Sequence, residues 1–298
     1  MSTKVAVLIL AFNRPEHVVK ALEPVRVYQP ERLYLACDGP RARKKGEAVL
    51  VYATQKAMLK IIDWPCDVKT LFRKENLGCA NAVYEAITWF FEHEEYGIII
   101  EDDVIVGQDF FKLCEVLLSR YANEEKIMEI SAENHSGRID INNSYVYSQY
   151  FLCWGWATWR RAWAKMDMSM KAVKELSTFY FIKRLGLFRG MMMRYYFKKG
   201  YRHINNFNSW ATRWYLSILA LDGLVLCPGV NLAINIGMEG GTHYYSARDN
   251  LYSSLSIGKM DWPLVYNDKC AIDKKQKKYD SIDFFCIRMI GLKKKLFG

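Results

Sequence analysis

The sequence predicts an α/β domain with a mainly parallel central sheet flanked by helices, and a helical, aromatic-rich C-terminal part. Short apolar runs alternate with longer amphipathic segments through residues 5–106, and polar residues follow each apolar run. One of these runs, GIIIEDDVIV at residues 97–106, starts with consecutive rather than alternating apolar residues. Such β-branched runs are typical of strands buried on both faces, and strands that alternate with helices build parallel sheets with right-handed crossovers.

The spacing of apolar residues gives the order of the elements in the first half. We expect strands at residues 5–10, 32–36, 68–73 and 97–100. The first connecting helix begins near Pro15, since proline suits the first turn of a helix. A charged helix follows at residues 44–60, and a third helix starts after a turn at Gly78.

Three acidic residues follow the fourth strand directly. Glu101, Asp102 and Asp103 come immediately after three isoleucines, at the edge where ligands bind in open α/β sheets. Adjacent carboxylates repel one another and cannot be buried unpaired. A hard divalent cation that also holds a diphosphate is therefore their natural partner. The alternative is a solvated acidic turn after an ordinary strand.

Other predicted strands also end in polar residues. Asn13 and Arg14 follow the first strand, Asp38 follows the second, and Glu133 follows a further strand at residues 127–132. Because parallel strands end at one edge of a sheet, we expect these side chains to line a site at its carboxyl edge.

Four tryptophans lie within residues 154–163. Trp159 and Trp163 are four residues apart and would share a helix face, which favours core packing. Trp154 and Trp156 bracket Gly155, where the missing side chain lets a ligand approach the backbone, and a flat ring suits the face of a sugar. We therefore expect Trp156 to contact a sugar, with core packing as the alternative.

The second half contains three further segments with open interpretations. Residues 179–200 mix aromatics and methionines with basic residues and contain no acid, so they form a solvated basic helix or contact a membrane surface or an anionic acceptor. The GMEGGTHYY segment predicts a mobile flap, in which His243 is structural or contacts a donor. The tail at residues 284–298 is a weak interfacial anchor or a frayed end.

The composition limits the classes of protein to which this chain can belong. A chain of 298 residues can bury a full core, and its formal charge of +10 implies an anionic partner, whether nucleic acid, a membrane surface or a phosphorylated small molecule. The sequence has no run near the ~20 apolar residues of a spanning helix and no signal-peptide pattern, so we expect a cytoplasmic protein. Eight cysteines without a C-x-x-C pair indicate reduced thiols. The phosphate loop and the strand-linked G-x-G-x-x-G are absent, which argues against ordinary kinases and dehydrogenases.

In order, the segments VLILAFNRP, ACDGP, NLGCANAV, EDDVIVGQDFF, CWGWATWRRAW and NLAINIGMEGGTHY resemble nucleotide-sugar glycosyltransferases of the GT-A fold. They are similar to bacterial family 2-like transferases and, more distantly, to the animal N-acetylglucosaminyltransferase that starts complex N-glycan branches. The resemblance implies one Rossmann-like GT-A domain at residues 1–246, with a donor half at about 1–106 and an acceptor half at about 107–246. A basic, amphipathic extension follows at residues 247–298.

The resemblance also implies a function and partners. The chain would transfer a sugar, N-acetylglucosamine or a hexose, from a UDP-linked donor to a glycan or lipid-linked saccharide, with inversion. Mn²⁺ or Mg²⁺ would bind Asp103 and bridge the diphosphate. An anionic surface on the inner face of the membrane is a further expected partner, and nucleic acid is not. The resemblance implies that Asn13, Arg14 and Asp38 bind the base and ribose and that Asp102 lies near the ribose or the sugar. We also expect Asn76, Trp156 and His243 to bind the donor.

One position departs from the family pattern. Inverting relatives place an aspartate beside the tryptophan that matches Trp210, where it takes the proton of the acceptor hydroxyl, but here residues 208–211 are NSWA. None of the neighbours of Trp210 is a carboxylate base. We predict Glu133 as the base ahead of Glu239, because a strand end holds a group more rigidly than a flap. Alternatively, Glu133 orients acceptor hydroxyls.

Two other functions stay open. A sugar nucleotidyltransferase shares strand-end carboxylates, but it normally has a glycine-rich N-terminal signature with a basic residue, which AFNRPEH lacks. A non-catalytic sugar-nucleotide or glycan-binding protein would keep the fold and lack the base.

Overall fold

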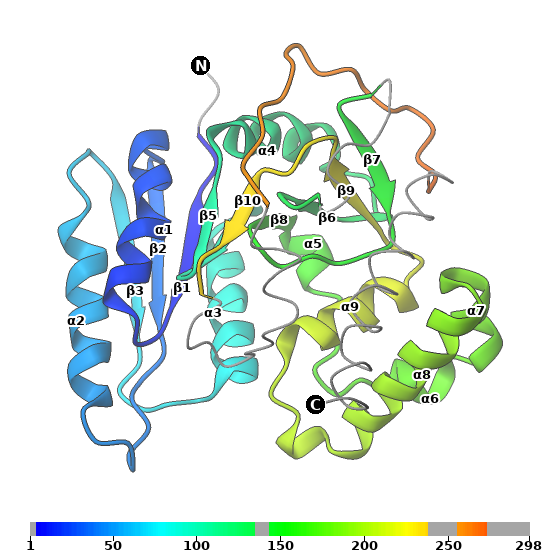
Figure 1. The fold of residues 1–298 in the computed structure, drawn as a ribbon, viewed down its shortest axis with the longest axis horizontal. Helices are drawn as coiled ribbons and strands as arrows, with labels where there is room; N and C mark the ends of the chain where they lie inside the picture. The colour runs from blue at the N-terminus through cyan, green and yellow to red at the C-terminus, as the bar shows by residue number, and fades with distance from the viewer. Residues whose placement is uncertain (1–3, 135–142, 238–254, 273–298) are drawn as a thin grey trace, which may run out of the picture.

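An eight-stranded sheet forms the centre of the computed structural model, which describes residues 4–134, 143–237 and 255–272 (Figure 1). The strand order is β3-β2-β1-β4-β8-β6-β9-β7. Four of its seven neighbouring pairs are parallel, namely β1 with β2, β1 with β4, β2 with β3, and β6 with β9. The strands are β1 (Val7–Ala11), β2 (Arg32–Cys37), β3 (Asp67–Phe72), β4 (Tyr96–Glu101), β6 (Ile127–Ser131), β7 (Tyr145–Ser148), β8 (Trp156–Trp159) and β9 (Leu224–Pro228). The predicted α/β fold with a mainly parallel sheet is confirmed.

Helices cover both faces of this sheet. They are α1 (Pro15–Tyr28), α2 (Glu47–Lys60), α3 (Cys79–His93), α4 (Gln108–Arg120), α5 (Arg160–Trp163), α6 (Ala172–Glu175), α7 (Thr178–Leu185), α8 (Leu187–Arg202) and α9 (Trp210–Ala220). Helix α1 packs against α2 and α4, whereas α3 packs against α5 and α9. Since right-handed crossovers run from β1 to β3 in one direction and from β3 to β4 in the other, these two groups lie on opposite faces.

The acidic run leaves the sheet at its centre. Strand β4 lies between β1 and β8, and the three isoleucines at residues 98–100 are fully buried, as a strand covered on both faces requires. The chain turns at Asp102 and Asp103 and enters β5 (Val104–Val106), which pairs with β10 (Ala233–Asn235) in a separate two-stranded sheet. The predicted run at residues 97–106 is therefore two strands joined by an acidic turn.

Two predictions about the aromatic part are wrong in detail. Trp159 ends strand β8, and α5 starts at the next residue, so Trp159 and Trp163 share no helix face, although both are buried in the core. The basic segment at residues 179–200 is not one helix, because Gly186 adopts a φ of +84° and separates α7 from α8. Figure 1 shows α6 to α9 grouped at one end of the molecule.

The remaining expectations concern thiols and spanning helices. The seven cysteines in the described ranges form no disulfide with one another, which agrees with reduced thiols. None of the described helices is both long and apolar enough to cross a bilayer.

Residues 255–272, from the predicted C-terminal extension, pack onto the domain through Met260 and Leu264.

Candidate functional site

The acidic turn after β4 meets Arg14, which follows β1. The guanidinium of Arg14 donates from Nη1 to Oδ2 of Asp103 at 2.8 Å and lies 4.0 Å from Oδ1 of Asp102. The other oxygen of Asp102 accepts a hydrogen bond from the backbone N–H of Phe12 at 3.1 Å. The sheet thus brings together three of the residues predicted to bind the donor and the metal.

Among the residues that the structure describes, Arg14 is the cation that pairs with this turn. Burial raises the pKa of Glu101 to about 8, and repulsion from Asp103 and Asp102 adds to that effect. Burial, again with repulsion from Asp103, raises the pKa of Asp102 to about 7, although Arg14 opposes this shift. One guanidinium therefore does not offset three clustered carboxylates.

Strand β10 fixes the position of Asp103, a contact that sequence reasoning missed. The backbone C=O of Asp103 accepts from the N–H of Ile236 at 2.8 Å, and its Oδ1 accepts from Nδ2 of Asn235 at 3.4 Å. A Cβ added at Gly237 would lie 2.1 Å from Oδ2 of Asp103, so only glycine fits there. The approach of β10 limits the directions that the carboxylate can take.

The donor set of this turn fits a hard divalent cation. Carboxylate oxygens are the ligands that Mg²⁺ and Mn²⁺ take in proteins, and the excess negative charge favours a cation. Within the described ranges, however, no group of three His, Cys, Asp or Glu side chains is placed to hold a metal ion. A cation at Asp103 would therefore complete its coordination with oxygens from a ligand.

The carboxylate of Asp38 holds a loop rather than facing open solvent. Its two oxygens accept from the backbone N–H groups of Gly39, Leu77 and Gly78 and from Nδ2 of Asn76, at 2.8 to 3.2 Å. Asp38 and Asn76, both predicted to bind the donor, contact each other and join the ends of β2 and β3. Burial raises the pKa of Asp38 above its ordinary value despite these bonds.

Asn13 is held by a glutamate that the sequence did not single out. Its Nδ2 donates to Oε1 of Glu47 at 3.1 Å. Glu47 is buried at the start of α2, and its carboxylate also accepts from the side chain and the backbone N–H of Arg41. Arg41 in turn lies over the ring of Phe12, 5.6 Å from its centroid. This cluster fixes the loop between β2 and α2 beside the end of β1.

Glu133 lies at the end of β6, close to the acidic turn. Its charge contributes to the raised pKa of Glu101, so the two groups are within electrostatic reach. Its Oε1 accepts from the backbone N–H of Trp154, its own N–H donates to Oγ of Ser131, and only 2% of the residue is exposed. The structure therefore places the predicted base near the site and ties it to the segment before β8.

Trp156 has no ring face open to a ligand. Its exposed fraction is 1%, and its ring stacks on Trp210 with centroids 5.6 Å apart and an interplanar angle of 18°. Gly155 has a φ of +71°, and a Cβ there would lie 2.5 Å from Val106, so a neighbouring strand explains this glycine. The structure supports the alternative reading, in which Trp156 packs in the core.

The position beside Trp210 carries no carboxylate and has a structural role instead. Oδ1 of Asn208 accepts from the backbone N–H of Ala80 at 2.9 Å, in the first turn of α3. Oγ of Ser209 caps α9 by accepting from the N–H of Thr212. These contacts join the first turns of α3 and α9. The other predicted base, Glu239, and the predicted donor contact His243 lie outside the described residues.

No family model matches the chain, and no curated protein matches it either. Solved structures are only distantly similar. The inositol-1-phosphate CTP transferase from T. maritima is 12% identical, with a TM-score of 0.39 over 85% of this chain and 98% of that one. Mouse xyloside xylosyltransferase 1 is 9% identical, with a TM-score of 0.36 over 73% and 82%. The glycosyltransferase GlyE in Streptococcus pneumoniae is 13% identical, with a TM-score of 0.34 over 58% of this chain and 41% of GlyE.

Proposed function

We propose that this protein transfers a sugar from a nucleotide diphosphate sugar to a saccharide acceptor, with a divalent cation bound at Asp103. The observation that carries this proposal is the acidic turn at the carboxyl edge of β4, with Arg14 at hydrogen-bond distance from Asp103. A diphosphate and a cation together satisfy both charges: the cation pairs with the carboxylates, and the diphosphate is available to Arg14. We propose UDP as the nucleotide and Mn²⁺ or Mg²⁺ as the cation.

The reaction exchanges one bond at the anomeric carbon for another. The acceptor hydroxyl oxygen attacks this carbon, the bond to the diphosphate oxygen breaks, and the nucleoside diphosphate leaves with the electron pair. A bound cation would offset the charge that develops on the leaving diphosphate. In our proposal, the carboxylate of Glu133 takes the hydroxyl proton, and Arg14 orients the diphosphate.

The hydrogen bond from the N–H of Trp154 is the reason for assigning this role to Glu133, because it holds the carboxylate at the end of β6. Only 2% of the residue is exposed, so the role requires the acceptor hydroxyl to reach a carboxylate that the fold covers. The hydrogen bond from Trp154 is equally compatible with a second role, in which Glu133 only orients acceptor hydroxyls. Turnover of a Glu133→Gln variant separates the two roles.

The experiment that tests this function is a thermal shift screen of nucleotide sugars with and without Mn²⁺. A donor at about 100 times its dissociation constant stabilises the folded chain by about 2.7 kcal/mol. We expect a UDP sugar to raise the melting temperature in the presence of Mn²⁺ and to lose most of this effect in EDTA. Failure of every nucleotide sugar to shift the melting temperature under both conditions would overturn the proposal.

A sugar nucleotidyltransferase is the second candidate, because it also uses strand-end carboxylates. The structure disfavours it at the connection between β1 and α1. Only residues 12–14 separate Ala11 from Pro15, which leaves no room for a glycine-rich loop around a triphosphate. Incubation with UTP and sugar 1-phosphates decides between the two, since a nucleotidyltransferase would release inorganic diphosphate.

A further inference from the structure

Two helices expose large apolar side chains beside basic ones. On α7 and α8, Phe188 is 84% exposed and Phe179 is 73% exposed, and three neighbouring apolar residues are more than half exposed. These three are Leu187, Met191 and Tyr195. Exposing such side chains to water is unfavourable. Large contiguous apolar patches on a protein surface mark sites of interaction with other molecules.

The exposed side chains of α8 lie along one stripe of the helix. Leu187, Met191 and Tyr195 are spaced four residues apart, so they project from the same side, and Lys198 and Arg202 continue that side toward the end of the helix. The stripe is thus apolar at its start and basic at its end. The opposite side of α8, which includes Met193 and Phe197, packs in the core with Phe181 of α7.

The basic residues of this segment divide into two groups. Arg184, Arg189 and Arg194 serve the fold: the first pairs with Asp222, the second lies 3.4 Å from the ring centroid of Tyr150, and the third donates to the C=O of Val173. The other four are exposed and form no ion pair with any part of the chain that the structure describes. These four are Lys183, Lys198, Lys199 and Arg202.

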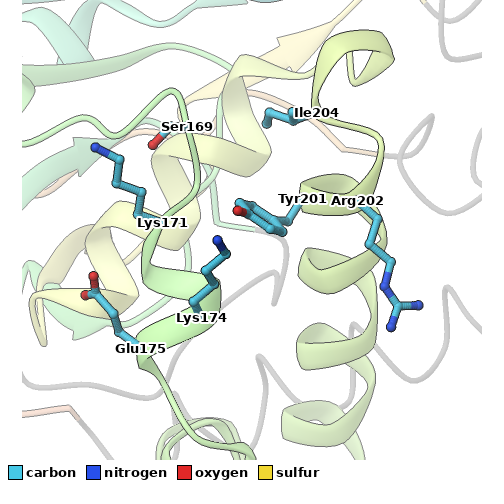
Figure 2. Close-up of a pocket in the computed structure, with 7 residues that line it drawn as sticks. All are labelled: Ser169, Lys171, Lys174, Glu175, Tyr201, Arg202 and Ile204. Atoms are coloured by element: carbon cyan, nitrogen blue, oxygen red, sulfur yellow. The ribbon is translucent and has the colours of Figure 1, made fainter.

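No acidic residue lies between Glu175 and Asp222 in the sequence, so α7 and α8 supply no carboxylate of their own to these cations. A pocket of about 610 Å³ borders the basic end of α8, between that helix and residues 169–175 (Figure 2). Figure 2 shows the amine of Lys174 directed toward Tyr201, whereas the guanidinium of Arg202 extends from the other side of the helix. The four cations are divided between α7 and α8, and only Arg202 of the four lines this pocket. This distribution suits an extended anionic surface better than a small anion.

We propose that the exposed face of α7 and α8 docks on a membrane containing anionic lipids. Phe188, Leu187 and Met191 would enter the boundary between headgroups and acyl chains, while the four free cations contact lipid phosphates. A second copy of the chain is disfavoured, because two such faces would bring like charges together. A nucleic acid would engage the cations but leave Leu187 and Met191 exposed.

This docking surface bears on the substrate class, a step that rests on the proposed glycosyl transfer. Helix α8 ends at Arg202, eight residues before Trp210, and the start of α9 contacts α3 beside the donor site through Asn208. A transferase docked on a membrane would meet its acceptor there, so we propose a lipid-linked saccharide as the acceptor class. Vesicle binding itself needs no sugar nucleotide, so docking and transfer can fail independently.

Co-sedimentation of the full chain with vesicles tests the proposal. We expect binding to vesicles of phosphatidylcholine mixed with phosphatidylglycerol at low salt, and much weaker binding to phosphatidylcholine alone. Each cation contributes about fivefold to partitioning, so replacing all four with glutamine should weaken binding by roughly 10²- to 10³-fold. Raising the salt concentration should weaken wild-type binding in the same direction.

Apolar variants and a matched control complete the test. Phe188→Ala combined with Met191→Ala removes exposed side chains only, and it should weaken vesicle binding about tenfold or more. Tyr52→Ala combined with Lys56→Gln changes a similar exposed pair on α2, and it should bind like the wild type.

Four outcomes would overturn the proposal. The first is no vesicle binding at low ionic strength, and the second is binding that ignores the anionic lipid fraction. The third is binding that the α8 variants leave unchanged or that the α2 control reduces equally. Sedimentation of the chain without vesicles would indicate self-association through this face and would also contradict docking.

Discussion

Replacing Asp38 with asparagine should destabilise the fold, because its carboxylate is the acceptor for four donors. One oxygen accepts from the N–H groups of Gly39 and Leu77, and the other accepts from Gly78 and the amide of Asn76. Asparagine offers a single oxygen, so in either orientation its NH₂ group faces two donors. The variant therefore leaves two donors without an acceptor on this side chain, of which at most one, the N–H of Gly39, is fully buried.

The size of the effect follows from those two donors. Each buried donor left unsatisfied costs about 1 to 3 kcal/mol. Burial raises the pKa of Asp38, which means that the ionised carboxylate is itself unfavourable, and removal of the charge recovers part of the loss. Because most of these donors are only partly buried, we expect a net loss of roughly 1 to 3 kcal/mol, which lowers the melting temperature by about 2 to 8 °C.

Thermal unfolding followed by the fluorescence of the buried tryptophans measures this loss. The control is Asp63→Asn, which breaks a pair with Arg26 at a side chain that is 49% exposed and should cost less than about 1 kcal/mol. The Asp38→Asn variant could instead have the melting temperature of the wild type and no longer bind nucleotide sugars. In that case Asp38 contacts the ligand without stabilising the fold, and the structural argument is wrong.

Three further predictions concern the base and the loop cluster. Glu133→Gln should lower turnover by about 10² to 10⁴-fold with donor binding unchanged in calorimetry, and near-normal turnover would exclude Glu133 as the base. Ser209→Asp or Ala211→Asp should leave turnover no higher than wild type in the same assay, since a gain would show that the site lacks its base. Bonding to Arg41 lowers the pKa of Glu47 to about 2, below its unfolded value of about 4.3, so its stabilisation is present above that value and is lost as pH falls. Glu47→Gln should therefore lower the melting temperature at neutral pH, and a difference that persists unchanged toward pH 2 would contradict this.

The sequence was sufficient for strands β1 to β4, for β6 and for the acidic turn, because these depend on local pattern, whereas β7, β8 and β9 were not predicted. Three consecutive isoleucines mark a strand buried on both faces, and the carboxylates that follow it must lie at its exit. Arg14 and Asp103 are 89 residues apart, yet the parallel order of β1 and β4 placed them at one edge. Topology alone was enough to bring this pair together.

Contacts between distant segments were not predictable in the same way. Glu47 binds Asn13 although 34 residues separate them in the sequence, and Asn235 binds Asp103 across 132 residues. No sequence motif predicts either contact. A tryptophan beside a glycine has the same sequence pattern whether it binds a sugar or packs in a core. For Trp156 the outcome depends on Trp210, which only the folded chain brings into contact.

The measurement that tests the central claim most directly is calorimetry of UDP binding to wild type and Asp103→Asn, with and without Mn²⁺. The neutral amide holds a hard cation poorly, so we expect the variant to lose about 10- to 100-fold or more in Mn²⁺-dependent affinity for UDP. Asp63→Asn, the same change far from the site, should bind like the wild type. Unchanged UDP affinity with unchanged dependence on Mn²⁺ in Asp103→Asn would contradict metal binding at the acidic turn.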